Sequence, residues 1–115
     1  MIRVGVLGTD HAAVADSRYN IAVVHLLLGS PHDAQREFVA ALDAHVSPNT
    51  TQAANLRYGL AMAEHQIGSY KAAHSNYLAA RRIREGLHGK DHALVAEVDA
   101  CLNALNVDSD SRIAG

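Results

Sequence analysis

Eight histidines and one cysteine are the side chains in this sequence that could bind a metal ion or carry out catalysis. His88 and His92 stand four residues apart, but Gly89 and Asp91 lie between them, so the two rings do not share one regular helix. The sequence has no HExxH motif and no pair of cysteines, the spacings that zinc sites usually require. Cys101 falls on an apolar helical face, where a cysteine behaves as a small hydrophobic residue. We therefore expect no metal, no cofactor and no enzymatic activity.

The clearest cluster of charge is basic and consists of Arg81, Arg82, Arg84 and Lys90. Aromatic residues are not interleaved with it, as they are on surfaces that bind single-stranded nucleic acid. The formal net charge of −2 gives no general attraction to nucleic acid either. We therefore interpret the cluster as favourable charge at the end of a helix, where it complements the helix dipole.

Hydropathy and cysteine usage favour a cytoplasmic protein. No apolar run approaches the roughly 18 residues of a membrane span, and no charged and then apolar leader is visible. A single cysteine excludes a disulfide within the chain and favours a reducing compartment. We expect neither a membrane nor nucleic acid as a partner.

Two distant segments of the chain have nearly the same sequence. Residues 2–17 match residues 83–98 at a constant offset, and glycines, an aspartate and a histidine all keep this register. The matched pairs are Ile2/Ile83, Arg3/Arg84, Gly5/Gly86, Gly8/Gly89, Asp10/Asp91, His11/His92, Val14/Val95 and Ala15/Ala96. Self-similarity at a fixed offset indicates a repeat array.

A shorter offset divides this distance into two steps. Arg18 and Tyr19 recur as Arg57 and Tyr58. Five further pairs keep the same register: Ala22/Ala61, Gly29/Gly68, Ala34/Ala73, Phe38/Tyr77 and Ala41/Ala80. The second step is longer by three positions, and this difference fits the turn near Pro48, because turns tolerate length changes that packed helices do not.

The pattern predicts an all-α chain of five helices, at about 11–28, 31–46, 50–67, 70–86 and 92–106. We expect N-caps at Asp10, Ser30, Asn49 or Thr50, Ser69 and Asp91. Pro31 suits the first position of a helix, and Gly29 and Gly68 each follow a helix where a positive φ is required. The positions expected to face inward are Ile21, Ala22, Leu28, Ala34, Phe38, Ala41, Leu42, Leu60, Ala61, Ile67, Ala73, Tyr77, Ala80, Ile83, Leu94, Val95, Val98, Cys101, Leu102 and Leu105.

The repeats divide the chain into five segments. Residues 1–9 are expected to be the end of a truncated preceding repeat, 10–48 and 49–90 to be two complete units, 91–106 to be the first helix of a third unit or a capping helix, and 107–115 to be a flexible tail. Because a half-helix cannot bury its own apolar face, we interpret the chain as a fragment of a longer repeat protein.

The two complete units resemble tetratricopeptide repeats, which pair two helices through a glycine turn with small facing residues and an aromatic residue in the second helix. The residues that carry the resemblance are Ile21, Ala22, Gly29, Ala34, Phe38 and Ala41 in the first unit and Leu60, Ala61, Gly68, Tyr70, Ala73, Tyr77 and Ala80 in the second. Both steps exceed the familiar period of about 34 residues. The joint at 83–96 is similar to the long-period subtype found in kinesin light chains and clustered-mitochondria proteins.

The resemblance covers about residues 2–105 and implies stacked antiparallel helix hairpins in a right-handed α-solenoid. Arg18 and Arg57 depart from the pattern, because a large apolar residue is usual at their position. Asn103 stands where a small residue is usual, which favours a capping role for the last helix.

In such an array the first helix of each pair lines a concave groove that binds a peptide or a partner protein. By register, the expected groove residues are Asp16, Tyr19, Asn20, Val23, Leu26, Asn55, Tyr58, Met62 and His65. Asn20 matches the groove asparagine that holds ligand backbone in the family, whereas the second unit has Gly59 there. The alternative for both tyrosines and for Met62 is ordinary packing between helices.

The predicted function is therefore that of a protein–protein interaction module within an adaptor or scaffold. The alternative is a structural spacer, or an assembly element that self-associates through its open repeat ends to form a homo-oligomer. Val14 is expected to be exposed at such an end.

Overall fold

The computed structural model describes residues 11–44 and 47–114, with side chains described for 13–44 and 47–110. This part of the chain is all-helical and contains no strand, which confirms the predicted all-α class. Its helices are α2 (His11–Leu27), α3 (Pro31–Asp43), α4 (Thr51–Ile67), α5 (Tyr70–His88) and α6 (Ala93–Ala114). The truncated repeat predicted at 1–9 and the N-cap predicted at Asp10 lie outside the described residues.

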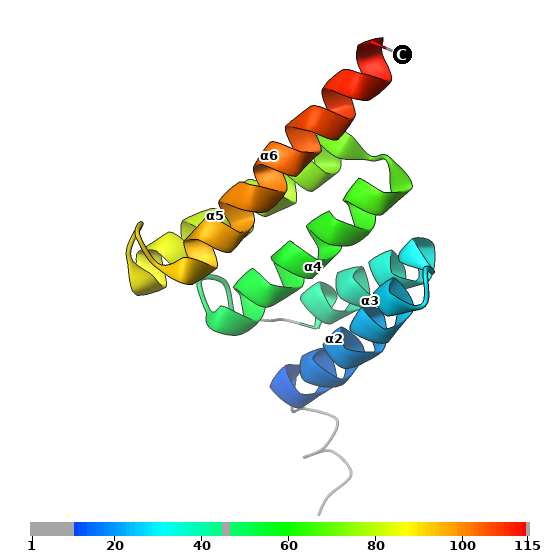
Figure 1. The fold of residues 1–115 in the computed structure, drawn as a ribbon. Coiled ribbons are helices and arrows are strands. Elements are labelled where there is room, and N and C mark those ends of the chain that lie inside the picture. The colour runs from blue at the N-terminus through cyan, green and yellow to red at the C-terminus, as the bar shows by residue number, and fades with distance from the viewer. Residues whose placement is uncertain (1–10, 45–46, 115) are drawn as a thin grey trace, which may run out of the picture.

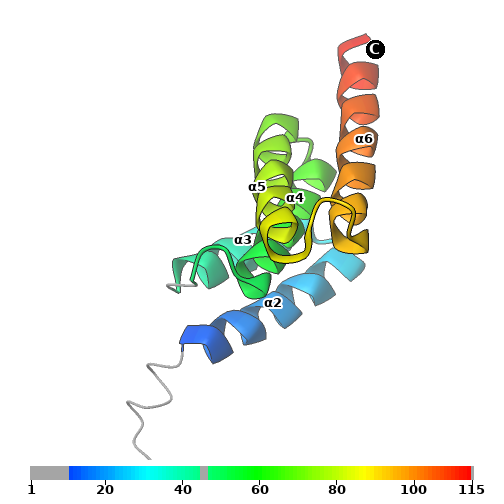
Figure 2. The same cartoon turned by 90° about the vertical axis from the view of Figure 1, so that its left-hand side faces the viewer.

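Successive helices run in alternating directions and pack on one another along the chain, from α2 to α6 (Figure 1). The side view shows α3 and α5 on one side of the molecule and α6 on the other, with α4 between them (Figure 2). Helix α2 also contacts α4, and side chains of α4 reach α6. The helices α2, α4 and α6 thus share one face, called the α2–α4–α6 face below. Among the described helices, none combines the length and the apolar character needed to cross a bilayer.

The turns between helices follow the predicted chemistry at four positions. Gly29 and Gly68 adopt φ values of +77° and +96°, in the left-handed region where glycine carries no steric penalty. Pro31 opens α3, where its missing N–H leaves no hydrogen bond unmade. The Thr50 hydroxyl accepts the N–H of Ala53 at 3.1 Å and so caps α4, as one of the two predicted alternatives. Ser30 and Ser69 occupy N-cap positions too, but their side chains make no capping hydrogen bond.

Helix α6 differs from its prediction at both ends. It begins after His92 rather than Asp91, and His92 Nδ1 accepts the N–H of Leu94 at 3.1 Å. An imidazole acceptor therefore takes the capping role expected of the aspartate carboxylate. The helix also continues to Ala114, so a flexible tail from residue 107 is not what the structure shows.

The core consists of two clusters in which alanines let helices approach closely and one aromatic ring fills the space between them. The first cluster contains Ala15, Ala22, Ala34, Phe38, Ala41, Leu56, Leu60 and Ala63. The second contains Ala61, Ala73, Tyr77, Ala80, Val98 and Leu105. The sequence prediction was wrong for Ile21 and Leu28, which are exposed. Ala22 takes the position that faces α3, and Ile21 lies about 100° around the helix from it.

A glycine allows α3 and α4 to pack closely. A Cβ atom built on Gly59 would lie 2.4 Å from the Cε1 and Cζ atoms of Phe38, far inside van der Waals contact. The Phe38 ring therefore occupies the space of the side chain that position 59 lacks. This explains why the second unit has glycine where the first has Asn20.

The arginines that depart from the repeat pattern both bond to the following helix. Arg18 Nη1 donates to Glu37 Oε1 at 2.9 Å, and Arg57 Nη1 donates to Asn76 Oδ1 at 3.1 Å. The two bonds join equivalent positions of the two units. In each unit a hydrogen bond between the two helices thus replaces the apolar contact that the resemblance implies.

Candidate functional site

Two matched pairs of aromatic rings position the centre of the α2–α4–α6 face. Tyr19 packs edge-on against Phe38 with ring centroids 6.0 Å apart and planes at 63°. Tyr58 packs against Tyr77 at the same 6.0 Å and the same 63°. Both first-helix tyrosines are half-buried, so each ring has one edge in the core and one toward the face. The equal geometry shows that the sequence repeat is also a structural repeat at these positions.

A polar hollow of about 310 Å³ lies between the first halves of α2 and α4. It is lined by Asp16, Tyr19, Asn20, Gln52, Asn55 and Leu56. Gln52 Nε2 donates to Asp16 Oδ1 at 2.7 Å and ties the two helices together across it. Amide and carboxylate groups here can accept from, or donate to, the backbone of an extended chain.

An apolar hollow of about 180 Å³ adjoins the polar one and shares Tyr19 with it. It is lined by Tyr19, Val23, Leu26, Leu27, Phe38, Tyr58, Gly59 and Met62. Its floor is the Phe38 ring and its rim includes Leu27, which is 81% exposed. This hollow has room for a benzene-sized group, since a dry cavity of about 150 Å³ is known to bind benzene.

A third hollow, of about 350 Å³, lies between α4 and α6 and is lined by Met62, His65, Gln66, Tyr77, Cys101, Ala104 and Asp108. His65 Nε2 lies 2.5 Å from Asp108 Oδ2, and its Nδ1 lies 3.4 Å from the Tyr77 hydroxyl. His65 therefore links the core tyrosine to the outer part of α6. The larger hollow of about 440 Å³ is on the other side of the molecule, between α3, α5 and the start of α4.

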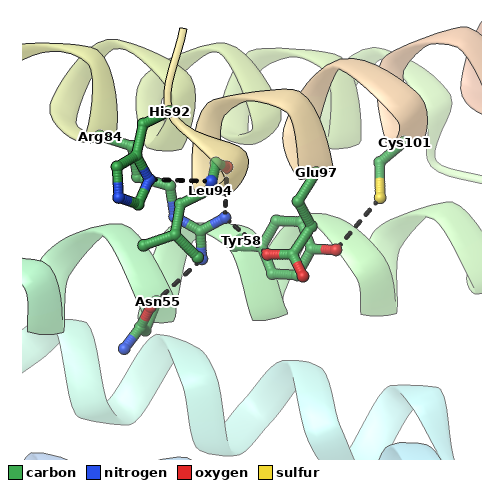
Figure 3. Close-up of polar contacts among 7 residues, drawn as sticks. All are labelled: Asn55, Tyr58, Arg84, His92, Leu94, Glu97 and Cys101. Carbon is green, nitrogen blue, oxygen red and sulfur yellow. Dashed lines mark hydrogen bonds and ion pairs between the residues drawn. The ribbon is translucent and has the colours of Figure 1, made fainter. Parts of the chain in front are cut away.

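Arg84 of α5 lies beneath this face, is only 4% exposed and connects α5 to α4 and α6 (Figure 3). Its Nη1 donates to the carbonyl of Leu94 at 3.0 Å and to Glu97 Oε1 at 2.8 Å. Its Nη2 donates to Asn55 Oδ1 at 3.2 Å, and its guanidinium stacks on the Tyr58 ring at 4.6 Å. The sequence predicted only favourable charge at a helix end for Arg84, whereas in the structure its side chain is buried and hydrogen-bonds to α4 and α6.

Burial favours the neutral form of Tyr58 and Tyr77, two of the three tyrosines of the second unit. Desolvation raises the pKa of Tyr58 and of Tyr77 well above the ordinary value of 10.0, and a hydrogen bond to Cys101 adds to the increase for both. The Tyr58 hydroxyl lies 3.2 Å from Cys101 Sγ. Neither phenol is set up to act as a base, so their contribution to the face is shape and hydrogen bonding.

The nine residues predicted to line a groove lie on this one face. Asp16, Asn20 and Asn55 line the polar hollow, Tyr19 lines the polar and apolar hollows, and Met62 lines the apolar and third hollows. The remaining four follow the same course, with Val23, Leu26 and Tyr58 in the apolar hollow and His65 in the third. Their role in binding stays a prediction, since Tyr19 and Tyr58 also pack in the core.

The residues that sequence reasoning missed include Gln52, Cys101 and Asp108, which line the hollows, and Arg84, which lies beneath the face. The longer of the two repeat offsets aligns Asn55 with Glu97. Both of these residues accept a hydrogen bond from Arg84, so their alignment was the sequence feature that could have predicted a shared partner. Asp108 carried no signal, because the helix was expected to have ended before it.

Metal binding has no support in the described part of the chain, where no three histidine, cysteine or acidic side chains are grouped as ligands. The rings of His88 and His92 stack at 4.4 Å with planes at 24°, although they belong to different elements. The pair thus closes the turn between α5 and α6 by ring contact.

No family model matches the chain, and no curated protein and no solved structure matches it. The likeness to tetratricopeptide repeats therefore rests on the sequence of this chain alone and stays a prediction.

Proposed function

We propose that this chain is a tetratricopeptide-like solenoid segment whose α2–α4–α6 face binds a segment of a partner protein. The observation that carries the proposal is the continuous row of hollows along this face, in which the polar hollow is followed by two hollows with mainly apolar surfaces. Neighbouring hollows share Tyr19 or Met62, so a single extended chain could engage all of them. Half-buried tyrosines with one edge toward the face are suited to such contacts, because they lose little entropy on binding.

The repeated geometry supports the solenoid part of the proposal. The edge-on pairs of aromatic rings and the hydrogen bonds of Arg18 and Arg57 occur at equivalent positions of the two units. The alanines of the facing sides are buried in both. Repeats that contact only their neighbours build extended surfaces of this kind.

Two neighbouring leucines provide a matched test. Leu27 lines the apolar hollow and is 81% exposed, whereas Leu28 is 73% exposed and lies outside it. A displayed library of random peptides, selected on the wild-type chain, is expected to yield binders. Leu27→Ser should weaken them at least tenfold, as loss of an apolar anchor does, and Leu28→Ser should leave them unchanged. Selection of no binder, or equal effects of both variants, would refute the proposal.

A second function, assembly through an unpaired helix face, is favoured by a specific observation. Val14, Ile21, Val24 and Leu28 form an exposed apolar stripe along α2. The equivalent positions of α4 are Ala53, Leu60, Ala63 and Ile67, of which the first three are buried. The α2 stripe therefore matches a surface that a neighbouring helix covers in the next unit.

Self-association through this stripe predicts a concentration-dependent mass in light scattering. The double variant Ile21→Ser, Val24→Ser should then be a monomer at every concentration. A wild-type chain that stays monomeric at millimolar concentration would exclude this second function.

A further inference from the structure

We propose, building on the peptide-binding function above, that the α2–α4–α6 face selects an extended ligand in which a cationic and a large apolar side chain stand three residues apart. The polar hollow would take the cation and the adjoining apolar hollow the apolar group. A hollow lined by one carboxylate and three amides and an adjoining hollow with a mainly apolar surface share one wall, Tyr19, and define such a pair of subsites.

Charge complementarity specifies the cation. Asp16 lines the polar hollow, and the hydrogen bond it accepts comes from the neutral amide of Gln52. No ion pair joins Asp16 to a cation among the described residues. Along the same face Glu97 and Asp108 are further carboxylates, each more exposed than the basic group that it pairs with. The most exposed charged groups named along this face are therefore carboxylates, and a lysine or arginine of a ligand lowers the energy of Asp16.

The apolar hollow specifies the second side chain. At about 180 Å³ it has the size of a space that holds a benzene ring, which suits phenylalanine or leucine. The groups that line it are aromatic, aliphatic or thioether, so a polar side chain placed there would lose its hydrogen bonds.

Helix geometry specifies the spacing. On both α2 and α4, the residues that line the apolar hollow lie on average about five to six positions after those that line the polar hollow. A helix rises about 1.5 Å per residue, so the centres of the two hollows are about 8–9 Å apart along the helices. An extended polyproline-II chain rises about 3.1 Å per residue and brings every third side chain to the same side, about 9.3 Å apart. A helical ligand would need about six residues to span the same distance, and its nearest spacing that returns to one face is about seven. The amides of Asn20, Gln52 and Asn55 line the polar hollow and suit the exposed backbone of an extended ligand.

Fluorescence anisotropy with labelled twelve-residue peptides tests this inference. The peptides are identical Gly-Ser chains that carry lysine and phenylalanine three residues apart in either order, the same pair seven residues apart, or glutamate in place of lysine. At low ionic strength one of the two orders with three-residue spacing should bind best. Its glutamate counterpart should bind about two- to fivefold more weakly, the range of one exposed ion pair. Added salt should reduce this difference.

Asp16→Asn should abolish the preference for lysine over glutamate, because the amide oxygen keeps the bond from Gln52 but loses the charge. The matched control is Asp43→Asn, which removes the same charge from the opposite side of the molecule and should leave the preference intact. Equal binding of lysine and glutamate peptides, or best binding by the seven-residue spacing, would overturn the inference. If library peptides bind and are lost with Leu27→Ser but show no cation preference, only this inference fails. If no library peptide binds, the proposed function fails with it.

Discussion

The close contact between Gly59 and Phe38 leads to the sharpest prediction, because two effects of opposite sign meet there. Replacing a helical glycine by alanine ordinarily stabilises a protein by about 1 kcal/mol, since alanine is the better helix former. At Gly59, however, the added Cβ would lie 2.4 Å from two carbons of the Phe38 ring, where ordinary contact begins at 3.4 Å. The ring or the helix must therefore move by about 1 Å.

Movement of the ring toward the apolar hollow that it lines would expose the ring to solvent. Phe38 is fully buried and packs edge-on against Tyr19, so a movement of the ring also disturbs this contact. Overpacking a well-filled core costs about 1–3 kcal/mol, and expelling a phenylalanine costs about 3–5 kcal/mol. After the helix-propensity gain of about 1 kcal/mol is subtracted, we expect Gly59→Ala to lower the free energy of unfolding by about 0–2 kcal/mol if the ring stays in the core, and by about 2–4 kcal/mol if it is expelled. Gly86, with nothing within 4 Å of an added Cβ, is the matched control, and Gly86→Ala should raise the free energy of unfolding by about 0.5–1 kcal/mol.

Urea denaturation followed by far-ultraviolet circular dichroism measures both values, and Tm should move by on the order of 4 °C per kcal/mol. A double-mutant cycle with Phe38→Leu isolates the contact, because the smaller side chain should relieve the clash with Ala at position 59. A Gly59→Ala protein at least as stable as Gly86→Ala, or additive effects in the cycle, would refute the reasoning.

Three further predictions follow from buried or capping groups. Arg84→Leu should cost about 2–4 kcal/mol in chemical denaturation, because three acceptors on two other helices lose their donor, and Arg84→Lys should recover less than half. Burial raises the pKa of Glu64 above its usual 4.5, so between pH 4.5 and the raised pKa the folded state holds more protons than the unfolded state, and this group makes stability fall as pH rises through that range. Glu64→Gln should flatten that fall in denaturation curves recorded at successive pH values, and an unchanged profile would contradict the assignment. Thr50→Ala should cost about 1 kcal/mol, whereas Ser69→Ala, whose hydroxyl caps nothing, should be close to neutral in the same assay.

Much of the helical layout could be predicted because it depends on local rules. Gly29, Gly68, Pro31 and Thr50 mark helix ends through their own backbone preferences, which need no knowledge of distant residues. The period of the small residues identified the faces that pack, and Ala22 is buried as expected.

The remainder depends on contacts between distant segments. Arg84 carries a charge in the last turns of a helix, which in most proteins means a solvated side chain, and only the return of α6 across α5 buries it. Gly59 is a weak helix former in the middle of a helix, and only the neighbouring ring explains it. The nine predicted face residues were placed by register alone, so their common side could be predicted, but the boundary between polar and apolar hollows could not.

The position of Arg84 has a consequence for how the chain unfolds. Stacked repeats commonly fray from their ends, each unit separating at its own cost. Here the Arg84 guanidinium on α5 donates hydrogen bonds to both α4 and α6. Separation of α6 would therefore leave this buried cation without its acceptors on α6. Amide hydrogens of α4, α5 and α6 should therefore exchange as one cooperative block, and we expect the second hairpin and its following helix to unfold together.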